Sequence, residues 1–358
     1  MNVILDTGSA DLWITSTNCT AATGCTDIPL LNASASTTAI DVETTFSVKY
    51  GSGSASGEIW KDYIGFAGYN VSNQSLALCD TVSTDLLNGN ISGLMGLGFQ
   101  SLAASGVTPF WQNLFVAGVL PFPGFAFYLT RFINISSAAS VEPGGVLTFG
   151  YLNSSLYSGE INYVPIPDGL ESYWVVPMDA VAVNGTNATS GTGAMVAVDT
   201  GTTLIGGPTN DVKAIYEKIV GAQAATGDYT GPFGISGNVS TCLGAFFDLT
   251  LSSTSKISWV IGAAFLKNVF SVFRADPASV GFALLSDGKA TYNGTLIYNS
   301  TTHSGNPNIS QTLTQLPNGI YGPSGVTSLR TTVAANTITT AIEAGQTASR
   351  SPLAGAGR

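Results

Sequence analysis

The chain contains two copies of one short segment, 193 positions apart. Residues 3–9 read VILDTGS, and residues 196–202 read VAVDTGT. Each copy is a run of apolar residues, which favours a buried β-strand, and each run ends in Asp-Thr-Gly followed by a hydroxyl side chain. Because a repeat of this kind is typical of a duplicated structural unit, we predict two similar lobes.

A second pair of segments follows the first. Leu-Met-Gly at 94–96 and Val-Ile-Gly at 260–262 each place a glycine after two apolar residues. Asp6 precedes its glycine by 90 positions, whereas Asp199 precedes its own by 63, so the second half is 27 residues shorter. The duplication therefore extends beyond the aspartates themselves, although the two halves differ in length.

Strand patterns dominate the rest of the chain. The 358 residues suffice for two lobes and a large core. Runs rich in Val, Phe, Tyr and Thr, separated by many of the 42 glycines, predict strands at 45–50, 145–150 and 173–183. Helical patterns are confined to 110–118 and 209–221. We predict a mainly β fold with a few short helices.

The charge balance excludes one class of partner. The chain has 12 Lys and Arg against 22 Asp and Glu, a net charge of −10, and only 9% charged residues. A nucleic-acid-binding surface needs a basic patch, which this composition does not supply, so we expect no nucleic-acid partner. A chain with so few cations also avoids strong self-repulsion when its carboxylates are protonated, which permits work at low pH.

Several catalytic classes are disfavoured by the side chains present. His303 is the single histidine and lies in a Ser/Thr/Asn-rich tail, so we interpret it as solvated and expect neither a metal site nor a cofactor. A Ser-His-Asp triad would depend on that one imidazole. Ser253 and Lys256 form a Ser-x-x-Lys motif without its companion motifs, so a Ser-Lys hydrolase is a weak alternative. The four cysteines show no Cys-x-x-Cys spacing.

The chain reads as a secreted glycoprotein without a membrane span. The uncharged stretch 86–130 is interrupted by prolines and glycines, so we interpret it as core. Residues 1–5 contain no secretion signal, which leads us to expect that the sequence begins late. Acceptor sequences for N-glycosylation begin at Asn18, Asn32, Asn70, Asn73, Asn90, Asn134, Asn153, Asn184, Asn187, Asn238, Asn293, Asn299 and Asn308.

The repeated aspartates suggest a specific chemistry. A single Asp-Thr-Gly is more often a structural turn, but a pseudo-twofold axis between two copies would bring Asp6 and Asp199 face to face. Two adjacent carboxyl groups share one proton, so one acts as a base on water while the other donates to a carbonyl oxygen. Such a pair hydrolyses an amide without a metal or a covalent nucleophile.

The neighbouring residues suit this role. The glycines allow close backbone approach, the following hydroxyls bond the outer carboxylate oxygens, and the threonines tie the two loops together. These supporting residues are Thr7, Gly8, Ser9, Thr200, Gly201 and Thr202.

On these motifs the sequence resembles the pepsin-like aspartic proteases secreted by fungi. The match covers roughly residues 3 to 285 and includes both Asp-Thr-Gly motifs. Further matching segments are Asp-Leu-Trp at 11–13, the loop from Cys19 to Cys25, Tyr-Gly-Ser-Gly at 50–53, Gly-Gly-Val-Leu-Thr-Phe-Gly at 144–150, Tyr-Trp at 173–174, Trp-Val-Ile-Gly at 259–262 and Phe-Ser-Val-Phe-Arg at 270–274.

The resemblance implies a bilobal fold, with pseudo-twofold related lobes around a substrate cleft. It implies an N-terminal lobe at 1–158, which includes a flap, and a C-terminal lobe at 159–287. The composition of 288–358 predicts a disordered Ser/Thr-rich tail. Tyr50, Gly51 and Ser52 would form the flap tip, with Trp13 hydrogen-bonded to the tyrosine and Cys19 and Cys25 in a disulfide. Apolar cleft candidates are Ile14, Phe99, Phe110 and Leu114, each of which is favoured more as core.

The implied function is aspartic endopeptidase activity at acidic pH on protein or peptide substrates, with a preference for apolar residues around the cut. We expect the protein to be a monomer that is either secreted or vacuolar. A non-catalytic binding protein on the same fold is the alternative; such relatives often lose an aspartate or the flap tyrosine, and this chain retains Asp6, Asp199 and Tyr50.

The sequence also departs from the family pattern. Family members carry further residues before the first Asp-Thr-Gly, whereas only residues 1–5 precede Asp6 here. They also have a strand pair and a cysteine before the segment that corresponds to 240–243, and we do not recognise either in this sequence. We therefore expect Cys79 and Cys242 to be free thiols, and the chain to be a truncated product that is poorly folded or inactive.

Overall fold

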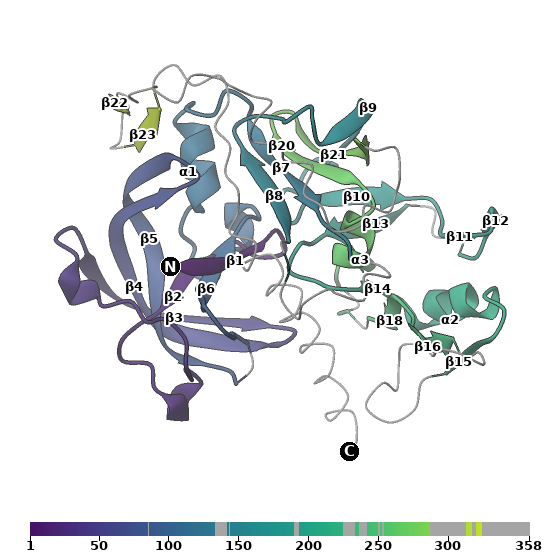
Figure 1. Cartoon of the computed structure of the whole chain (residues 1–358), viewed down its shortest axis with the longest axis horizontal. Helices are drawn as coiled ribbons and strands as arrows, with labels where there is room; N and C mark the ends of the chain where they lie inside the picture. The colour runs from purple at the N-terminus through teal and green to yellow at the C-terminus, as the bar shows by residue number, and fades with distance from the viewer. Residues whose placement is uncertain are drawn as a thin grey trace.

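Three β-sheets form the body of the molecule in the computed structural model (Figure 1). The structure describes residues 1–84, 86–132, 142, 144–189, 193–224, 233–235, 242–249, 251–252, 254–286, 313–316 and 320–323; at 223–224, 233–235, 242–243, 313–316 and 320–323 it describes the backbone alone. His303 and Ser253, which the sequence interpretation singled out, lie outside these residues.

The N-terminal sheet carries the first Asp-Thr-Gly. Its core has the strand order β1-β6-β2-β5, in which β1 runs parallel to β6 and β2 runs parallel to β5. A long hairpin of β3 and β4 extends this sheet through the pairing of β4 with β5. The strands are β1 (Asn2–Asp6), β2 (Leu12–Thr15), β3 (Ile40–Tyr50), β4 (Gly53–Phe66), β5 (Tyr69–Val82) and β6 (Ile91–Gly96).

The C-terminal sheet repeats this topology. Its order is β10-β13-β19-β14-β18, with β13 parallel to β19 and β14 parallel to β18. Ile4 pairs with Leu94 in the first sheet, and the equivalent Ala197 pairs with Val260 in the second. The predicted duplication is therefore a duplication of strand order, direction and register. The strands are β10 (Val175–Met178), β13 (Ala194–Val198), β14 (Ile205–Gly207), β18 (Phe246–Asp248) and β19 (Trp259–Ile261).

A central sheet joins the two lobes. Its order is β8-β7-β20-β21-β9, so strands from the middle of the chain pair with strands near residue 280. Trp174 and Phe273 are fully buried beside this sheet, with ring centroids 5.5 Å apart. The lobe boundary expected after residue 158 falls inside β9. The strands are β7 (Gly124–Leu129), β8 (Gly145–Phe149), β9 (Tyr157–Pro165), β20 (Phe270–Ala275) and β21 (Ala278–Leu285).

Both predicted helices form, each shorter than the sequence pattern indicates. α1 (Phe110–Val116) buries Phe110, Trp111 and Leu114, and α2 (Thr209–Glu217) begins directly after a proline, as expected for a residue with fixed φ. A third helix, α3 (Ala263–Leu266), is only four residues long and was missed. Short 3₁₀ turns occupy Ala21–Thr23, Ala33–Ala35 and Gln100–Leu102. The predicted mainly β, bilobal fold is confirmed.

Several strands are too short for a sequence pattern to reveal. A three-stranded sheet of β15 (Ala222–Ala224), β16 (Phe233–Ile235) and β17 (Cys242–Leu243) lies where we expected a strand pair to be missing, so β15 and β16 correct that expectation. Two- and three-residue strands carry no measurable alternation of apolar and polar residues. β11 (Ala182–Val183) pairs with β12 (Thr186–Asn187).

Two strands are described within the segment expected to be a disordered tail. β22 (Leu313–Leu316) pairs with β23 (Ile320–Pro323), and β23 pairs with the start of β5 through Val71. The segment therefore contains some regular structure, whereas its composition led us to expect disorder throughout.

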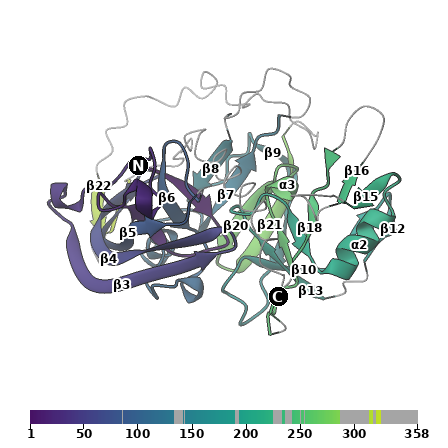
Figure 2. The same ribbon diagram turned by 90° about the horizontal axis from the view of Figure 1, so that it is seen from below.

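The hairpin of β3 and β4 and the helix α2 lie at opposite ends of the molecule, as both views show (Figures 1 and 2). Among the residues that the structure describes, no helix is long and apolar enough to cross a membrane.

Candidate active site

Asp6 and Asp199 occupy equivalent positions in the two related sheets. Asp6 is the last residue of β1, and Asp199 follows directly after β13. The amide of Asp199 donates to the carbonyl of Ile261 at 3.0 Å, which holds the strand end against β19. Asp6 is buried and Asp199 is half-buried. The duplicated strands therefore position both carboxyl groups in the same way.

Each aspartate accepts the same pair of hydrogen bonds from its own turn. A glycine amide bonds one carboxylate oxygen, and a hydroxyl bonds the other. The donors to Asp6 are Gly8 at 2.8 Å and Ser9 at 2.6 Å, and the donors to Asp199 are Gly201 at 2.8 Å and Thr202 at 2.5 Å. These bonds fix the orientation of both carboxyl groups, as the sequence predicted.

The two threonines of the motifs hold the lobes together. Thr7 Oγ1 donates to the carbonyl of Val198 at 2.8 Å, and Thr200 Oγ1 donates to the carbonyl of Leu5 at 2.7 Å. Each hydroxyl also accepts a bond from the amide of the other threonine, at 3.0 Å and 3.1 Å. Both side chains are buried, so the network is closed and shielded from water.

The glycines of the motifs pack against the opposite aspartates. A Cβ on Gly8 would lie 2.6 Å from Cγ of Asp199, which is closer than real Cβ contacts. A Cβ on Gly201 would collide in the same way with Oδ1 of Asp6. The absence of a side chain at both positions is therefore what permits the two carboxyl groups to approach each other.

Burial is the largest influence on the protonation of Asp6. It raises the pKa of this carboxyl well above its usual value, and the charge of Asp199 and a hydrogen bond to Asp199 raise it further. The bonds from Ser9 and from the amide of Gly8 oppose this rise. Because both carboxyl groups also lie against the same glycine turn at Gly201, they are neighbours, and the site favours a shared proton over two negative charges.

The residues predicted to form a flap lie at the end of the hairpin of β3 and β4, and Tyr50 contacts Trp13 of β2 there. Trp13 Nε1 donates to the hydroxyl of Tyr50 at 2.8 Å, as the resemblance implied. Trp13 is fully buried and Tyr50 is half-buried, while Gly51 and Ser52 form the turn between β3 and β4. Burial raises the pKa of Tyr50, and the charge of Asp6 adds to this rise, so the phenol remains protonated.

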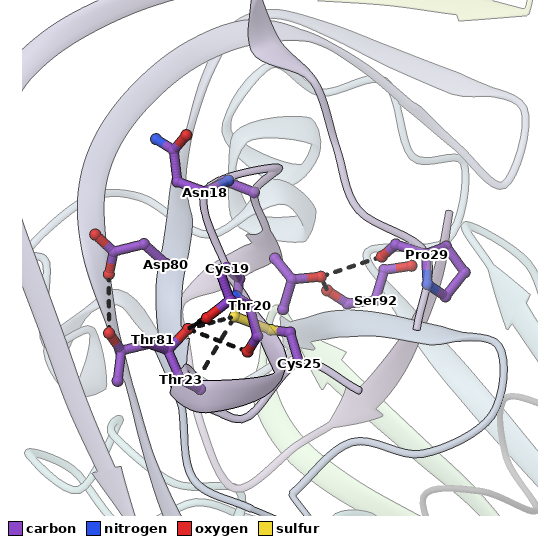
Figure 3. Close-up of a disulfide and its surroundings, with 11 residues drawn as sticks. Asn18, Cys19, Thr20, Thr23, Cys25, Pro29, Asp80, Thr81 and Ser92 are labelled. Carbon is purple, nitrogen blue, oxygen red and sulfur yellow. Dashed lines mark hydrogen bonds between the residues drawn. A yellow bond between two sulfur atoms is a disulfide. The ribbon is translucent and has the colours of Figure 1, made fainter. Parts of the chain in front are cut away.

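The first pair of cysteines forms a disulfide. Cys19 and Cys25 are bonded and close a short loop around a 3₁₀ turn, and the hydroxyl of Thr23 bonds within the loop (Figure 3). The pairing that the resemblance implied is therefore present. Cys79 is buried and free, as expected. The side chain of Cys242 lies outside the described residues.

The four apolar cleft candidates belong to the core. All are buried and pack in one cluster with the central aromatic residues. The interpretation favoured from the sequence, that these side chains stabilise the fold, is therefore the one that the structure supports. They are Ile14, Phe99, Phe110 and Leu114.

Sequence reasoning missed two residues near the dyad. Asp11 is buried and accepts bonds from the amides of Ala104 at 2.8 Å and Ser105 at 3.1 Å, so it orders the turn that precedes α1. Its position in the motif was noted, but a local pattern does not reveal partners some ninety residues away. Tyr173 was noted only as part of a matching segment; burial raises its pKa, and the charges of Asp199 and then Asp6 add to this rise.

In the described part of the chain, no three His, Cys, Asp or Glu residues gather in a way that could hold a metal ion. The arrangement that does form is a buried pair of carboxyl groups with symmetric donors. Such a pair can hold a water molecule, remove a proton from it and donate a proton to a carbonyl oxygen.

Comparisons with known proteins agree with this geometry. A family model described as eukaryotic aspartyl protease matches residues 1–232. The chain is 36% identical to major aspartyl peptidase 1 of Cryptococcus neoformans var. grubii, over 82% of this chain and 67% of that protein. It is 31% identical to cathepsin E-B of Xenopus laevis, over 78% and 75%, and 29% identical to pepsin A of Bos taurus, over 78% and 79%. The chain belongs to the eukaryotic aspartyl protease family.

Proposed function

We propose that this chain is an aspartic endopeptidase that hydrolyses peptide bonds of protein substrates at acidic pH. The observation that carries the proposal is the buried carboxyl of Asp6, whose pKa is raised by burial and by the adjacent Asp199. A pair of carboxyl groups that keeps one proton provides an acid and a base at one site. The names of the relatives, an aspartyl peptidase, a cathepsin and a pepsin, support the same reaction class.

In the proposed reaction, the ionised carboxylate removes a proton from a water molecule held between Asp6 and Asp199. The water oxygen attacks the carbonyl carbon of the peptide bond, while the neutral carboxyl donates its proton to the carbonyl oxygen. The resulting intermediate carries two hydroxyl groups on the former carbonyl carbon. It collapses when the neutral carboxyl, which now holds the proton taken from water, protonates the amine nitrogen, while one hydroxyl of the intermediate returns its proton to the ionised carboxylate and the C–N bond breaks. The dyad therefore ends each cycle with the single shared proton with which it began, and no covalent bond to the enzyme forms.

The supporting residues keep the dyad in one geometry. The bonds from Gly8, Ser9, Gly201 and Thr202 give each of the four carboxylate oxygens a fixed donor, so neither carboxyl group is free to rotate. The buried bonds of Thr7 and Thr200 prevent the lobes from separating at this point. Both sets preorganise the charges before the substrate arrives, which is the main way in which an active site lowers a barrier.

Tyr50, Gly51 and Ser52 form the proposed flap over the substrate. Since the Tyr50 oxygen accepts a hydrogen bond from Trp13 Nε1, its own O–H stays available to donate to the substrate or to water. Closure of such a hairpin excludes water from the bound peptide. A cleft with apolar walls would favour peptides with apolar residues around the cut.

The same chain carries the marks of the secretory route. One disulfide is formed, and three of the acceptor asparagines, Asn18, Asn90 and Asn184, lie in exposed turns. Disulfides persist in oxidising compartments, so we propose a secreted or vacuolar monomer whose partners are substrates.

The experiment is hydrolysis of an unfolded protein by this chain between about pH 3 and pH 5, with and without pepstatin, which mimics the tetrahedral intermediate. The proposal predicts cleavage that pepstatin abolishes and that falls steeply toward neutral pH. A folded preparation that binds pepstatin but cleaves nothing would instead identify a binding protein on this fold. Cleavage that resists pepstatin would come from a different site.

A further inference from the structure

A cavity of about 300 Å³ lies beside the strand that leads to Asp199. We name it the Tyr173 pocket, after the aromatic residue in its wall. Its volume is at the lower end of the range for small-ligand pockets, which suits one or two side chains. The lining residues used below are Leu170, Tyr173, Val175, Ser255, Lys256 and Ile257.

One wall of the Tyr173 pocket includes the start of β10, which pairs with β13, the strand that leads to Asp199. Val175 pairs with Ala197, two residues before Asp199, and the amide of Val198 donates to the carbonyl of Trp174 at 2.8 Å. Burial raises the pKa of Tyr173, and the charges of Asp199 and then Asp6 add to this rise, which agrees with the position of the pocket beside the strand pair that ends at Asp199. The pocket is therefore close enough to the dyad to receive a side chain of a bound peptide.

The opposite wall is a turn that is held in place. The hydroxyl of Ser255 donates to the carbonyl of Ile257 at 2.9 Å and accepts from its amide at 3.1 Å. The amide of Ser258 donates to the carbonyl of Met195 at 2.9 Å, which ties the turn to β13. Lys256 is thus presented from a fixed backbone and not from a free loop.

Lys256 is an unpaired cation at this position. Within the described part of the chain it has no ion pair and no hydrogen bond, and its side chain is exposed. The whole chain has only 12 Lys and Arg against 22 Asp and Glu, so a positive charge in the wall of the Tyr173 pocket is unusual for it. An unpaired ammonium next to an apolar wall fits a side chain with an apolar stem and an anionic end.

We propose that the Tyr173 pocket binds one substrate side chain near the cut and that Lys256 selects a carboxylate there, glutamate in particular. The methylene groups of glutamate would contact Leu170 and the ring of Tyr173, while its carboxylate would pair with Lys256. The inference rests on the proposed endopeptidase function. It adds to that function a preference for an acidic residue at one position of the substrate.

The test uses a set of peptides that share one sequence and carry either Glu or Gln at each of three positions on either side of the cut. Hydrolysis is measured at about pH 5, where glutamate is mostly ionised and lysine is protonated. The ratio of kcat/KM for the two peptides is compared within one enzyme preparation, so that differences in folding or concentration cancel. The enzymes are wild type, Lys256→Met, Lys256→Glu and the control Lys218→Met, which removes an exposed lysine at the end of α2.

At one position, the wild type should favour Glu over Gln by about two- to fivefold, as expected for an exposed ion pair. Lys256→Met should bring the ratio near one, Lys256→Glu should reverse it, and Lys218→Met should leave it unchanged. A wild-type ratio near one at every position, or a ratio that survives Lys256→Met, would overturn the inference.

Binding of the same peptides with a reduced, uncleavable bond separates this inference from the proposed function. If neither peptide is cleaved but the bound Glu peptide still has the lower Kd in a Lys256-dependent manner, the pocket assignment stands and the endopeptidase proposal fails. If cleavage is normal and neither Kd nor kcat/KM depends on Lys256, the pocket assignment fails alone.

Discussion

Thr7 and Thr200 exchange hydrogen bonds across the boundary between the lobes. The amide of Thr200 donates to the hydroxyl of Thr7 at 3.0 Å, and the amide of Thr7 donates to the hydroxyl of Thr200 at 3.1 Å. Each hydroxyl in turn donates to a carbonyl of the opposite lobe. Three polar groups on each side, the amide and hydroxyl of the threonine and one carbonyl, therefore find partners on the other side.

Replacing Thr7 with Val should destabilise the protein by about 1 to 3 kcal/mol, because the carbonyl of Val198 and the amide of Thr200 would be left buried without partners. Chemical denaturation measures this loss. The control is Thr17→Val at an exposed position, which should change the free energy of unfolding by less than about 0.5 kcal/mol. Equal effects of the two substitutions would show that the exchange contributes no stability.

Replacing Gly8 with Ala should reduce kcat/KM by at least about 100-fold, because the added Cβ would displace the carboxyl of Asp199 from its place beside Asp6. A Cβ on Gly51 would meet nothing within 4 Å, so Gly51→Ala serves as the control for folding stability alone. Its free energy of unfolding should stay within about 0.5 kcal/mol of the wild type. Full activity in Gly8→Ala would mean that the two loops do not need close contact.

The raised pKa of Asp6 predicts how stability depends on pH. Between the ordinary value of 3.8 and the raised value in the folded state, the folded protein binds more protons than the unfolded one. The contribution of Asp6 is therefore present below the ordinary pKa and is lost as pH rises through the folded pKa, with a slope of at most about 1.4 kcal/mol per pH unit.

Unfolding measured from about pH 4 to pH 7 should show this decline in the wild type and a flatter profile in Asp6→Asn, which cannot ionise. Asp168→Asn, at an exposed position, is the control and should keep the wild-type profile. An unchanged slope in Asp6→Asn would assign the pH dependence to other groups.

Tyr50→Phe removes the acceptor of the Trp13 bond while keeping the ring. We expect kcat/KM to fall about tenfold, since the flap loses the bond that orients it over the substrate. Tyr157→Phe, whose ring stacks on Phe270 in the central sheet, is the matched control and should retain wild-type activity. If both variants are equally active, the bond between Trp13 and Tyr50 has no part in catalysis.

The dyad could be predicted from sequence because the fold duplicates a local pattern. The same apolar strand and the same Asp-Thr-Gly occur twice, so symmetry alone brings Asp6 and Asp199 together. The hydrogen bonds of Ser9 and Thr202 follow from residue type and from a spacing of three positions. Such short-range relations are what a single sequence records most directly.

Long-range pairing could not be predicted in the same way. The central sheet pairs Phe125 with Phe273, and no local pattern marks two strands so distant in the chain as neighbours. Asp11 similarly finds its partners at Ala104 and Ser105, far along the chain. The strands β15 and β16 were missed for another reason, which is that three residues are too few to show a period.

The central claim is that Asp6 and Asp199 act as one catalytic unit that shares a proton. The most direct test is the rate of peptide hydrolysis by Asp6→Asn, Asp199→Asn and the double variant, with folding of each checked by the unfolding transition. The account predicts that either single substitution lowers kcat by about a thousandfold or more, and that the double variant is no slower than the slower single one, because residues of one unit are not additive. A single variant that keeps more than about a tenth of the wild-type kcat, or losses that multiply in the double variant, would contradict it.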